Sequence, residues 1–438
     1  MWISGMACFA VPILPDASRY EVKSLPASPP LARSWAGQLP ILGQEDGSAL
    51  FFWLFEAEDK ANDDTLIIWL NGGPGCSSLI RAFSENGPLM FLGNSSTLVP
   101  NPYSWTRLAN VLYVDQPVGT GFSHTTLSHE ATTNKQVVSD FFAWLQGFYR
   151  LFPGMLNKRT HMLGEAYAGA FVPYFASEIV KRHRELPVNL VSTSIGNGVF
   201  GNNAAMSATV TTSYLREQAS TLGIPADIFE AFSAADDACG FASVIRKGSE
   251  YPPQEPISLS GNPENLNFKR QVRSTAVLRR DTNNPIEEEE ELCNIIPTSP
   301  ESVMESILNS PCYGPCATFS TAADYLETMG LEKCFNIYNI KYNCSSIDPI
   351  SLLAAYLNRQ DVQHALNIRP TAVPFTPCNR TILSTLLSPS NHIVPPAYSV
   401  LPSLLSDHGI SVHIYHGELD MLIPDQGVEL AIQNMTWN

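Results

Sequence analysis

The sequence predicts an α/β fold in which helices cover both faces of a mostly parallel sheet. Short apolar runs of strand length recur along the chain, and most of them end at a glycine or at a turn that contains glycine or proline. Helical patterns follow several of these runs, so strands and helices alternate. This alternation is typical of parallel sheets, because parallel neighbours need a long crossover connection that a helix usually supplies.

Six strands are expected, because each is a short run of aliphatic and aromatic residues that ends before a turn. They lie at residues 50–56, 65–70, 111–114, 161–163, 190–195 and 412–415. Amphipathic patterns predict helices at residues 137–152, 171–182, 352–366 and 428–433.

Changes in composition divide the chain into a core in two parts and an insertion. The first part of the core covers residues 19–223, and the second covers residues 348–438. Residues 224–347, between them, hold short helical patterns and most of the cysteines. A polar stretch at about 246–291 predicts a mobile loop within this insertion.

Residues 1–18 predict a secretory signal peptide. The stretch 2–14 is apolar with small residues, and polar residues follow from Asp16. Because no Lys or Arg precedes the stretch, a structured start is the alternative. No apolar run reaches the roughly 18 residues that a membrane-spanning helix needs. We therefore expect a secreted or vacuolar protein of the secretory pathway, without a membrane span.

The cysteine pattern agrees with an oxidising compartment. Nine cysteines are present, and removal of a signal peptide that contains Cys8 leaves eight. Six lie between Cys239 and Cys344, which favours disulfide bonds in the insertion and leaves their pairing open. Zinc is the weaker alternative, because the close pair Cys312 and Cys316 has no clear second pair after it, so we expect no metal. Four glycosylation sequons also agree with secretion, at Asn94, Asn343, Asn379 and Asn434.

The composition excludes two broad classes of protein. Apolar residues make up 44% of the chain and charged residues 16%, which is far from the composition of disorder. The 26 Lys and Arg stand against 42 Asp and Glu, a net charge of −16, which works against a nucleic acid as partner. Nothing in the sequence sets the oligomeric state.

Four segments follow predicted strands and should meet at one edge of the sheet. They are NGGPGCSS at 71–78, DQPVGTGFS at 115–123, GEAYAG at 164–169 and HGELD at 416–420. In open α/β sheets, ligands bind outside the carboxyl ends of the strands. Glycine there lets a backbone N–H approach a substrate, as an oxyanion hole requires. GEAYAG has the frame of a nucleophile elbow, a sharp turn that normally presents a serine, but its central residue is Ala166.

These segments resemble the serine carboxypeptidases, especially the secreted fungal ones. WLNGGPGCSS, NPYSW followed by ANVLYVDQPVGTGFS, GEAYAGAFVPYFA, IGNG and YLNRQDVQHAL stand in that family's order and spacing, from about Val22 to the last residue. The resemblance implies an α/β-hydrolase fold with a disulfide-rich, largely helical insertion. It also implies release of C-terminal amino acids from peptides through an acyl-enzyme, peptide or protein C-termini as partners, and no cofactor.

The resemblance assigns catalytic positions to single residues. Ala166 occupies the place of the nucleophilic serine, and Asp420 matches the aspartate that orients the catalytic histidine. Asp420 could instead cap the helix that follows. The backbone N–H groups of Gly73 and Tyr167 match the oxyanion hole.

The resemblance also implies a binding site for the substrate's terminal carboxylate and one disulfide bond. The residues that match the carboxylate site are Trp69, Asn71, Glu85 and Glu165, and the matching cysteines are Cys76 and Cys378. Trp69 could also be an ordinary core residue. If the two glutamates face each other in a confined site, repulsion and desolvation raise the pKa of at least one. The retained proton can then be donated to a peptide's carboxylate, so we expect acid to favour binding.

Departures from the family's pattern affect the catalytic machinery. A methyl group at position 166 cannot attack a carbonyl, and Tyr167 is wrongly placed to replace a serine. The family's catalytic histidine lies in a Gly-His-Met-Val-Pro-like block beyond the aspartate motif, and the sequence reaches Asn438 without one. We therefore expect the catalytic histidine to be absent, and the strand and helix at the C-terminal end of the fold to be truncated.

Three further positions bear on the site: two histidines that do not replace the missing one, and one departure from the family's pattern. His416 is the histidine nearest to Asp420 in sequence, but we expect it to pack in or beside a strand, and His124 to lie on the surface or behind the site. Arg81 stands where the family usually has a small residue.

The sequence therefore favours a serine carboxypeptidase homologue that is inactive as written. Loss of the serine or the histidine from a comparable triad costs roughly a million-fold in turnover. Ala166 and the early end of the sequence fit a degenerate or mis-assembled gene product better than a deliberate substitution. One alternative is a non-catalytic protein that binds peptide C-termini, and another is a relative of the acyltransferases that share this fold.

Overall fold

The structure of the protein is a computed structural model. It describes residues 16–44, 46–93, 95–125, 131–252, 257, 297–309, 313–330, 335–342, 349–369, 374–388, 391, 393–435 and 437. The predicted signal peptide up to residue 15 and the predicted loop from residue 258 to 291 lie outside the described residues, as do four cysteines of the insertion.

The main sheet has the strand order β1-β2-β6-β3-β7-β8-β9. Its strands are β1 (Ser34–Pro40), β2 (Ala49–Phe55), β3 (Thr65–Leu70), β6 (Asn110–Asp115), β7 (Arg159–Glu165), β8 (Leu190–Gly196) and β9 (Ser411–Tyr415). β1, β2 and β6 pair antiparallel, and all the pairs from β6 to β9 are parallel. A short hairpin of β4 (Leu89–Phe91) and β5 (Leu98–Pro100) lies apart. The prediction of a mostly parallel sheet is confirmed.

All six expected strands are present, but β1, β4, β5 and one helix boundary were not foreseen. β1 is an additional edge strand. The single helix expected at 352–366 is wrong, because the chain forms α12 (Pro349–Leu357) and α13 (Gln360–Ala365) instead. The break occurs because the amide of Asn358 exchanges two hydrogen bonds with the backbone of Phe375, at 2.8 and 3.0 Å, and Arg359 is extended.

Two helical layers bury both faces of the central strands of the sheet. Alternate side chains of β2 enter opposite cores, so Phe52 and Leu54 lie in one cluster while Phe51 and Trp53 lie in the other. The first cluster includes α2 (Asn134–Leu151), α3 (Ala168–Lys181), α14 (Arg380–Leu386), α15 (Val400–Ser406) and α16 (Asp425–Gln433). The second includes α1 (Leu79–Ser84), α12 and α13. A strand buried on both faces explains the unbroken apolar run of β2.

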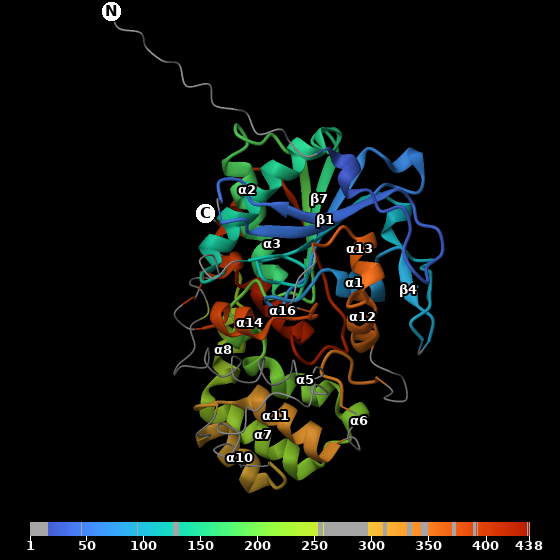
Figure 1. Ribbon diagram of the computed structural model, residues 1–438. Coiled ribbons are helices and arrows are strands. Elements are labelled where there is room, and N and C mark those ends of the chain that lie inside the picture. Colours follow the sequence, from blue (N-terminus) through green and yellow to red (C-terminus); the bar gives the residue numbers. More distant parts are fainter. Residues whose placement is uncertain are drawn as a thin grey trace, which may run out of the picture.

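A third core joins the helices of the insertion to two helices that directly precede it, α5 (Thr211–Glu217) and α6 (Ala219–Leu222). From the insertion it includes α7 (Ala226–Cys239), α10 (Pro300–Asn309) and α11 (Thr318–Tyr325). Figure 1 shows α7, α10 and α11 below the sheet, apart from the helices that flank it. A disulfide bond between Cys239 and Cys316 links the end of α7 to the segment just before α11. Cys316 is therefore no zinc ligand, because its sulfur is already bonded.

Shorter helical segments complete the described chain. They are η1 (Ala17–Tyr20), η2 (Lys60–Asn62), η3 (Trp105–Arg107), η4 (Pro153–Met155), α4 (Asn203–Met206), η5 (Ala208–Val210), α8 (Phe241–Gly248), η8 (Leu326–Gly330) and η10 (Pro396–Tyr398). Within the described ranges, no helix combines the length and the apolarity needed to cross a membrane.

Candidate active site

Ala166 lies at the tip of a sharp turn between β7 and α3. Its φ angle is +55°, a left-handed conformation that non-glycine residues rarely adopt. Hydrogen bonds hold this conformation, because the Ala166 N–H donates to Gly196 O at 3.1 Å and the Ala166 carbonyl accepts from Val199 N at 3.0 Å. Gly164 permits the close approach of strand and helix, since a Cβ there would lie 2.6 Å from that of Ala168. The backbone thus has the geometry of a nucleophile elbow, with a methyl group at its tip.

The glycine loop at 71–78 packs directly against this elbow. A Cβ on Gly72 would lie 2.4 Å from the backbone nitrogen of Tyr167 and 3.0 Å from the Ala166 Cβ. The predicted oxyanion residues, Gly73 and Tyr167, are therefore brought to one place. The ring of Tyr167 turns away to meet Phe171 edge-on, with ring centroids 5.0 Å apart.

Asp115, at the end of β6, anchors the glycine loop. Its Oδ1 accepts hydrogen bonds from Ser77 Oγ at 2.6 Å and from Ser78 N at 2.9 Å, and its Oδ2 accepts from Phe122 N at 3.0 Å. Burial raises the pKa of Asp115 to about 6, although these hydrogen bonds favour the ionised form. The carboxylate therefore stabilises the loop and shows no feature of a reacting group.

A disulfide bond fixes the other side of the loop. Cys76 is bonded to Cys378, as the resemblance implied, across a sequence separation of 302 residues. Backbone hydrogen bonds flank this bond on both sides, from Ser77 N to Pro377 O and from Asn379 N to Gly75 O, each at 2.8 Å. The loop is thus attached to the second part of the core.

The four residues predicted to bind a carboxylate gather on one face of the sheet. Trp69 pairs with Leu163 across β3 and β7, so by strand alternation Trp69, Asn71 and Glu165 point to the face covered by α1. Glu85 ends α1 on that face. The indole Nε1 of Trp69 and the Oδ1 of Asn71 are buried without a hydrogen-bond partner among the described residues. A ligand could supply those partners, since buried polar groups are normally paired.

Arg81 lies between the two glutamates, a role that the sequence did not indicate. Its Nε donates a hydrogen bond to Glu165 Oε1, and its Nη1 forms an ion pair with Glu85 Oε1 at 2.9 Å. Desolvation works against the charge of Arg81, but the two carboxylates outweigh it and raise the pKa of its guanidinium. Desolvation, and next the charge of Glu165, raise the pKa of Glu85 to about 7 in spite of Arg81. The expectation of a raised pKa in this pair agrees with the structure, but the pair is bridged by a cation.

Asp420 follows β9 and is held by an amide and two backbone N–H groups. Its Oδ2 accepts from Asn197 Nδ2 at 2.8 Å, and its Oδ1 accepts from Leu422 N at 2.8 Å and Ile423 N at 3.3 Å. Burial raises the pKa of Asp420 to about 7, against the effect of these donors. Asn197 is the second residue whose role in the site the sequence did not indicate, although it lies in the IGNG motif.

No histidine of the described residues is hydrogen-bonded to Asp420. The ring of His416 has no side-chain hydrogen bond among the described residues, and burial lowers its pKa, against the effect of the Ile423 backbone. His124 is held in the backbone pairing with Ala49 beside β2. His416 directly follows β9, which agrees with the expectation that it packs beside a strand.

The insertion reaches the site through the segment around Tyr338. Met421 N and Ile340 N hydrogen-bond across to Ile337 O and Leu419 O, at 2.9 and 3.2 Å, which ties this segment to the turn that carries Asp420. Tyr338 is 44% exposed, and its phenol lies within range of the charges of Arg81 and Asp420. Tyr338 therefore forms part of the wall above the site.

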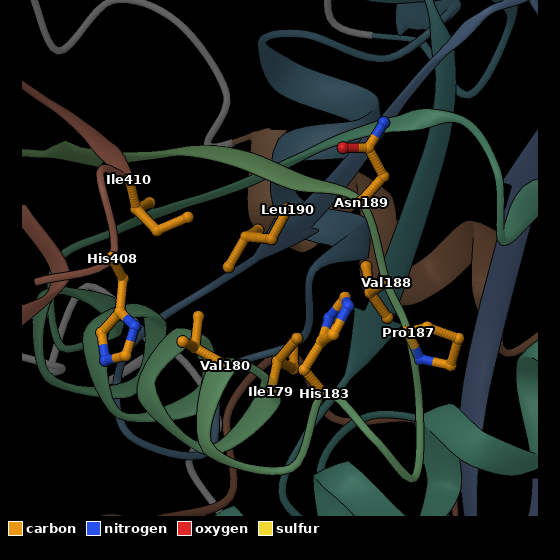
Figure 2. Close-up of a pocket in the computed structure, with 9 residues that line it drawn as sticks. All are labelled: Ile179, Val180, His183, Pro187, Val188, Asn189, Leu190, His408 and Ile410. Carbon is orange, nitrogen blue, oxygen red and sulfur yellow. The ribbon is translucent and has the colours of Figure 1, made fainter.

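The cavity shown in Figure 2 lies at the opposite edge of the sheet. It has a volume of about 340 Å³ and lies at the start of β8 and just before β9, whereas Ala166 follows the end of β7. Figure 2 shows Ile179 and Val180 between the imidazoles of His183 and His408. Its position separates it from the elbow.

Two of the predicted glycosylation positions are described, and both have structural roles. Asn379 caps α14 by accepting from Thr381 N at 3.0 Å, and its Nδ2 donates to Gly119 O. Asn434 is 2% exposed and accepts from Ile257 N, so its burial disfavours a glycan. Asn94 and Asn343 lie outside the described residues. Among the residues with described positions, no three His, Cys, Asp or Glu side chains form a group that could hold a metal ion.

Comparison with known proteins shows that the chain is similar to one protein family. The family model described as Serine carboxypeptidase matches residues 26–438. The Carboxypeptidase Y homolog of Arthroderma benhamiae is 50% identical over 429 residues, which are 97% of this chain and 83% of that protein. The pheromone-processing carboxypeptidase kex1 of Aspergillus clavatus is 30% identical over 435 residues, which are 97% of this chain and 60% of the relative.

A solved structure supports the same fold. The prohormone-processing carboxypeptidase Kex1(delta)p of Saccharomyces cerevisiae superposes with a TM-score of 0.69 at 22% identity, over 97% of this chain and 83% of that one. At this level of identity the likeness concerns the fold.

Proposed function

Because the chain belongs to the serine carboxypeptidase family, a family of hydrolases, we propose that it binds peptide C-termini beside Ala166 without hydrolysing them. The observation that carries the proposal is the elbow itself. The turn keeps its left-handed backbone and its contact with the glycine loop, but its tip presents a methyl group. A methyl group cannot form the acyl-enzyme on which the family's release of C-terminal amino acids depends.

The binding half of the proposal rests on unsatisfied polar atoms. Trp69 is 1% exposed, and its indole N–H has no acceptor among the described residues. The Oδ1 of Asn71 is also buried without a partner. Because an unpaired buried polar group costs about 1–3 kcal/mol, a ligand carboxylate that accepts from the Trp69 N–H would recover part of that cost.

The catalytic half is incomplete at a second point. In a Ser-His-Asp triad the aspartate orients the base, but here the described partners of Asp420 are Asn197 and two backbone N–H groups. The N–H groups of Gly73 and Tyr167 stand where an oxyanion would be stabilised. They alone give only the small residual rate that remains when a triad is removed.

We place the protein in the secretory pathway, secreted or vacuolar. The two disulfide bonds, Cys76–Cys378 and Cys239–Cys316, support this location because such bonds persist in oxidising compartments. The signal peptide at 1–18 and glycans at Asn94 and Asn343 belong to the same proposal.

The test measures binding and release with the same peptide. We expect calorimetry to detect binding of acetyl-Phe-Leu at pH 5, and amino-acid analysis to find no free leucine after prolonged incubation. Replacing Trp69→Phe removes the indole N–H and should weaken binding about tenfold. Trp105→Phe is the matched control, because the Trp105 ring packs edge-on against Trp69 with centroids 5.3 Å apart and has no proposed contact with the peptide.

Two results would overturn the proposal. Release of leucine by the unaltered chain would show that chemistry persists without a serine at position 166. Absence of binding at every pH would show that the pocket is not a receptor for peptide C-termini.

A further inference from the structure

We propose that Arg81 is part of the receptor for the ligand's terminal carboxylate, so that a fixed cation supplies the positive charge for binding. This inference rests on the proposed function, since it concerns the same pocket. The observation behind it is the position of Arg81, which contacts Glu85 and Glu165 together and lies on the helix that follows the glycine loop.

The guanidinium keeps donors free for a ligand. Arginine has five N–H groups; the described hydrogen bond uses the one on Nε, and Nη1 forms an ion pair with Glu85 Oε1 at 2.9 Å. Nη2 has no described partner, and 29% of the Arg81 side chain is exposed. A planar guanidinium binds a carboxylate through two parallel N–H donors, and Nη1 and Nη2 together present such an edge. The glutamates thus orient the group, and its remaining edge is available.

The site that Arg81 joins already contains unpaired groups. Trp69 and Glu165 point to the face of the sheet that α1 covers, and α1 carries Arg81. Glu165 also precedes Ala166 directly, so the contact between Arg81 and Glu165 places the guanidinium beside the elbow. A carboxylate held here would have its reacting peptide bond near position 166.

Arg81, Glu85 and Glu165 form a charged cluster, and its net charge decides the range of pH in which it can bind an anion. With Glu85 protonated, Arg81 and Glu165 cancel and the cluster is neutral. Since desolvation and the charge of Glu165 raise the pKa of Glu85 to about 7, the cluster stays neutral up to about that pH and becomes negative above it. Without Arg81, the same pair would carry a negative charge even with Glu85 protonated.

Other titratable groups around Arg81 do not change this sequence of charges. The phenols of Tyr338, from the insertion, and of Tyr415, from β9, lie within range of the cluster's charges. Tyr113, on β6, lies within range of the charge of Glu85. All three are neutral between pH 5 and 8. The charge of Glu165 acts on Asp420, whose own pKa is raised to about 7, chiefly by burial, so Asp420 also stays neutral up to about that pH.

The test compares acetyl-Phe-Leu with its C-terminal amide by calorimetry between pH 5 and 8. We expect the unaltered protein to bind the free acid at least about tenfold more tightly than the amide up to about pH 7. In Arg81→Met, which keeps the apolar stem, this preference should survive only at the acid end and disappear at pH 7. Arg81→Lys should retain part of it, because a lysine keeps the charge but loses the planar fork.

Arg182→Met is the matched control. Arg182 also contacts two glutamates, Glu178 and Glu185, but it lies at the opposite end of α3 from Ala166. Its replacement should leave both affinities unchanged. Circular dichroism checks that each variant is folded, and the ratio of acid to amide affinity within one protein is insensitive to a partly inactive sample.

The outcomes separate the inference from the proposed function. Equal acid-to-amide ratios in the unaltered protein and Arg81→Met across the pH range would overturn the role of Arg81 and leave peptide binding intact. Tighter binding of the free acid by Arg81→Met would also overturn it, by showing that Arg81 blocks the pocket. If no protein bound either peptide, the proposed function would fail and the inference with it.

Discussion

The side-chain amide of Asn197 donates a hydrogen bond to the carboxylate of Asp420, with 2.8 Å between Nδ2 and Oδ2. Asn197 lies directly after β8 and has a left-handed φ of +43°, and its Oδ1 also accepts from Gly417 N at 3.2 Å. One side chain therefore joins the ends of two neighbouring strands, β8 and β9. This contact fixes the side chain of Asp420, the residue that matches the aspartate of a catalytic triad.

Removal of the Asn197 side chain should destabilise the protein in a manner that depends on pH. Burial raises the pKa of Asp420 to about 7, so the group is neutral at pH 5 and ionised at pH 8. A hydrogen bond to a charged group contributes about 1.5–3 kcal/mol, against about 1 for a neutral one. Denaturant unfolding of Asn197→Gly should therefore show a loss larger by about 1 kcal/mol at pH 8 than at pH 5. Glycine is chosen because it tolerates the positive φ.

The dependence on pH should vanish when Asp420 cannot ionise. In an Asp420→Asn background, the effect of Asn197→Gly should be the same at both pH values. Equal losses at pH 5 and pH 8 in the unaltered background would contradict the assignment of this contact to the ionised carboxylate.

The contact between Gly72 and the elbow predicts a severe effect of one methyl group. In Gly72→Ala the new Cβ would meet the backbone nitrogen of Tyr167 at 2.4 Å and the backbone oxygen of Glu165 at 2.7 Å. Because backbone atoms cannot rotate away, the loop or the elbow must move, and we expect a cost of about 1–3 kcal/mol and loss of peptide binding. Gly154→Ala is the control, since a Cβ at Gly154 has no atom within 4 Å. Unfolding curves with near-equal midpoints for the two variants would refute this contact.

The sequence predicts those parts of the site that depend on residues close together in the chain, and not those that depend on contacts between distant residues. The strands and the four segments at their ends depend on local patterns, so they could be located by residue number. The bridge from Arg81 to Glu165 spans 84 positions and exists only because α1 packs over the end of β7. The same holds for Asn197 and Asp420, which are 223 positions apart.

The same distinction applies to the fold, in which some strands are marked by local patterns and other features are not. β2 and β3 have long apolar runs, which burial on both faces requires. β1 lies at the edge and includes Gly37 and Gln38, so its apolar pattern is weak. The helix break at Asn358 depends on a contact with Phe375, 17 positions away, and no local pattern marks it.

The two described disulfide bonds should differ in their effect on binding. Cys76–Cys378 closes 302 positions and fixes the glycine loop, whereas Cys239–Cys316 closes 77 positions within the insertion. In the chain-entropy model the longer loop contributes about 1 kcal/mol more, from a typical range of about 2–5 kcal/mol. Replacing Cys76 and Cys378 with alanine should lower stability more and weaken peptide binding, while the Cys239 and Cys316 pair should affect stability alone. A peptide affinity that is unchanged by the first pair would show that the loop holds its shape without the bond.

Asp236 in α7 should make the protein less stable as the pH rises. Burial raises the pKa of Asp236 to about 7, and a hydrogen bond from Thr318 only partly opposes this. Because the folded state holds the proton more tightly than the unfolded state does, stability falls between about pH 4 and pH 7 and is constant above. Asp236→Asn cannot ionise, so it should be more stable than the unaltered protein at pH 8 by up to about 4 kcal/mol and nearly equal to it at pH 4. Denaturant midpoints at the two pH values measure this difference, with the exposed neighbour in Asp237→Asn as the control. A gain of the same size in the control, or a gain that does not change with pH, would show that burial of Asp236 is not its cause.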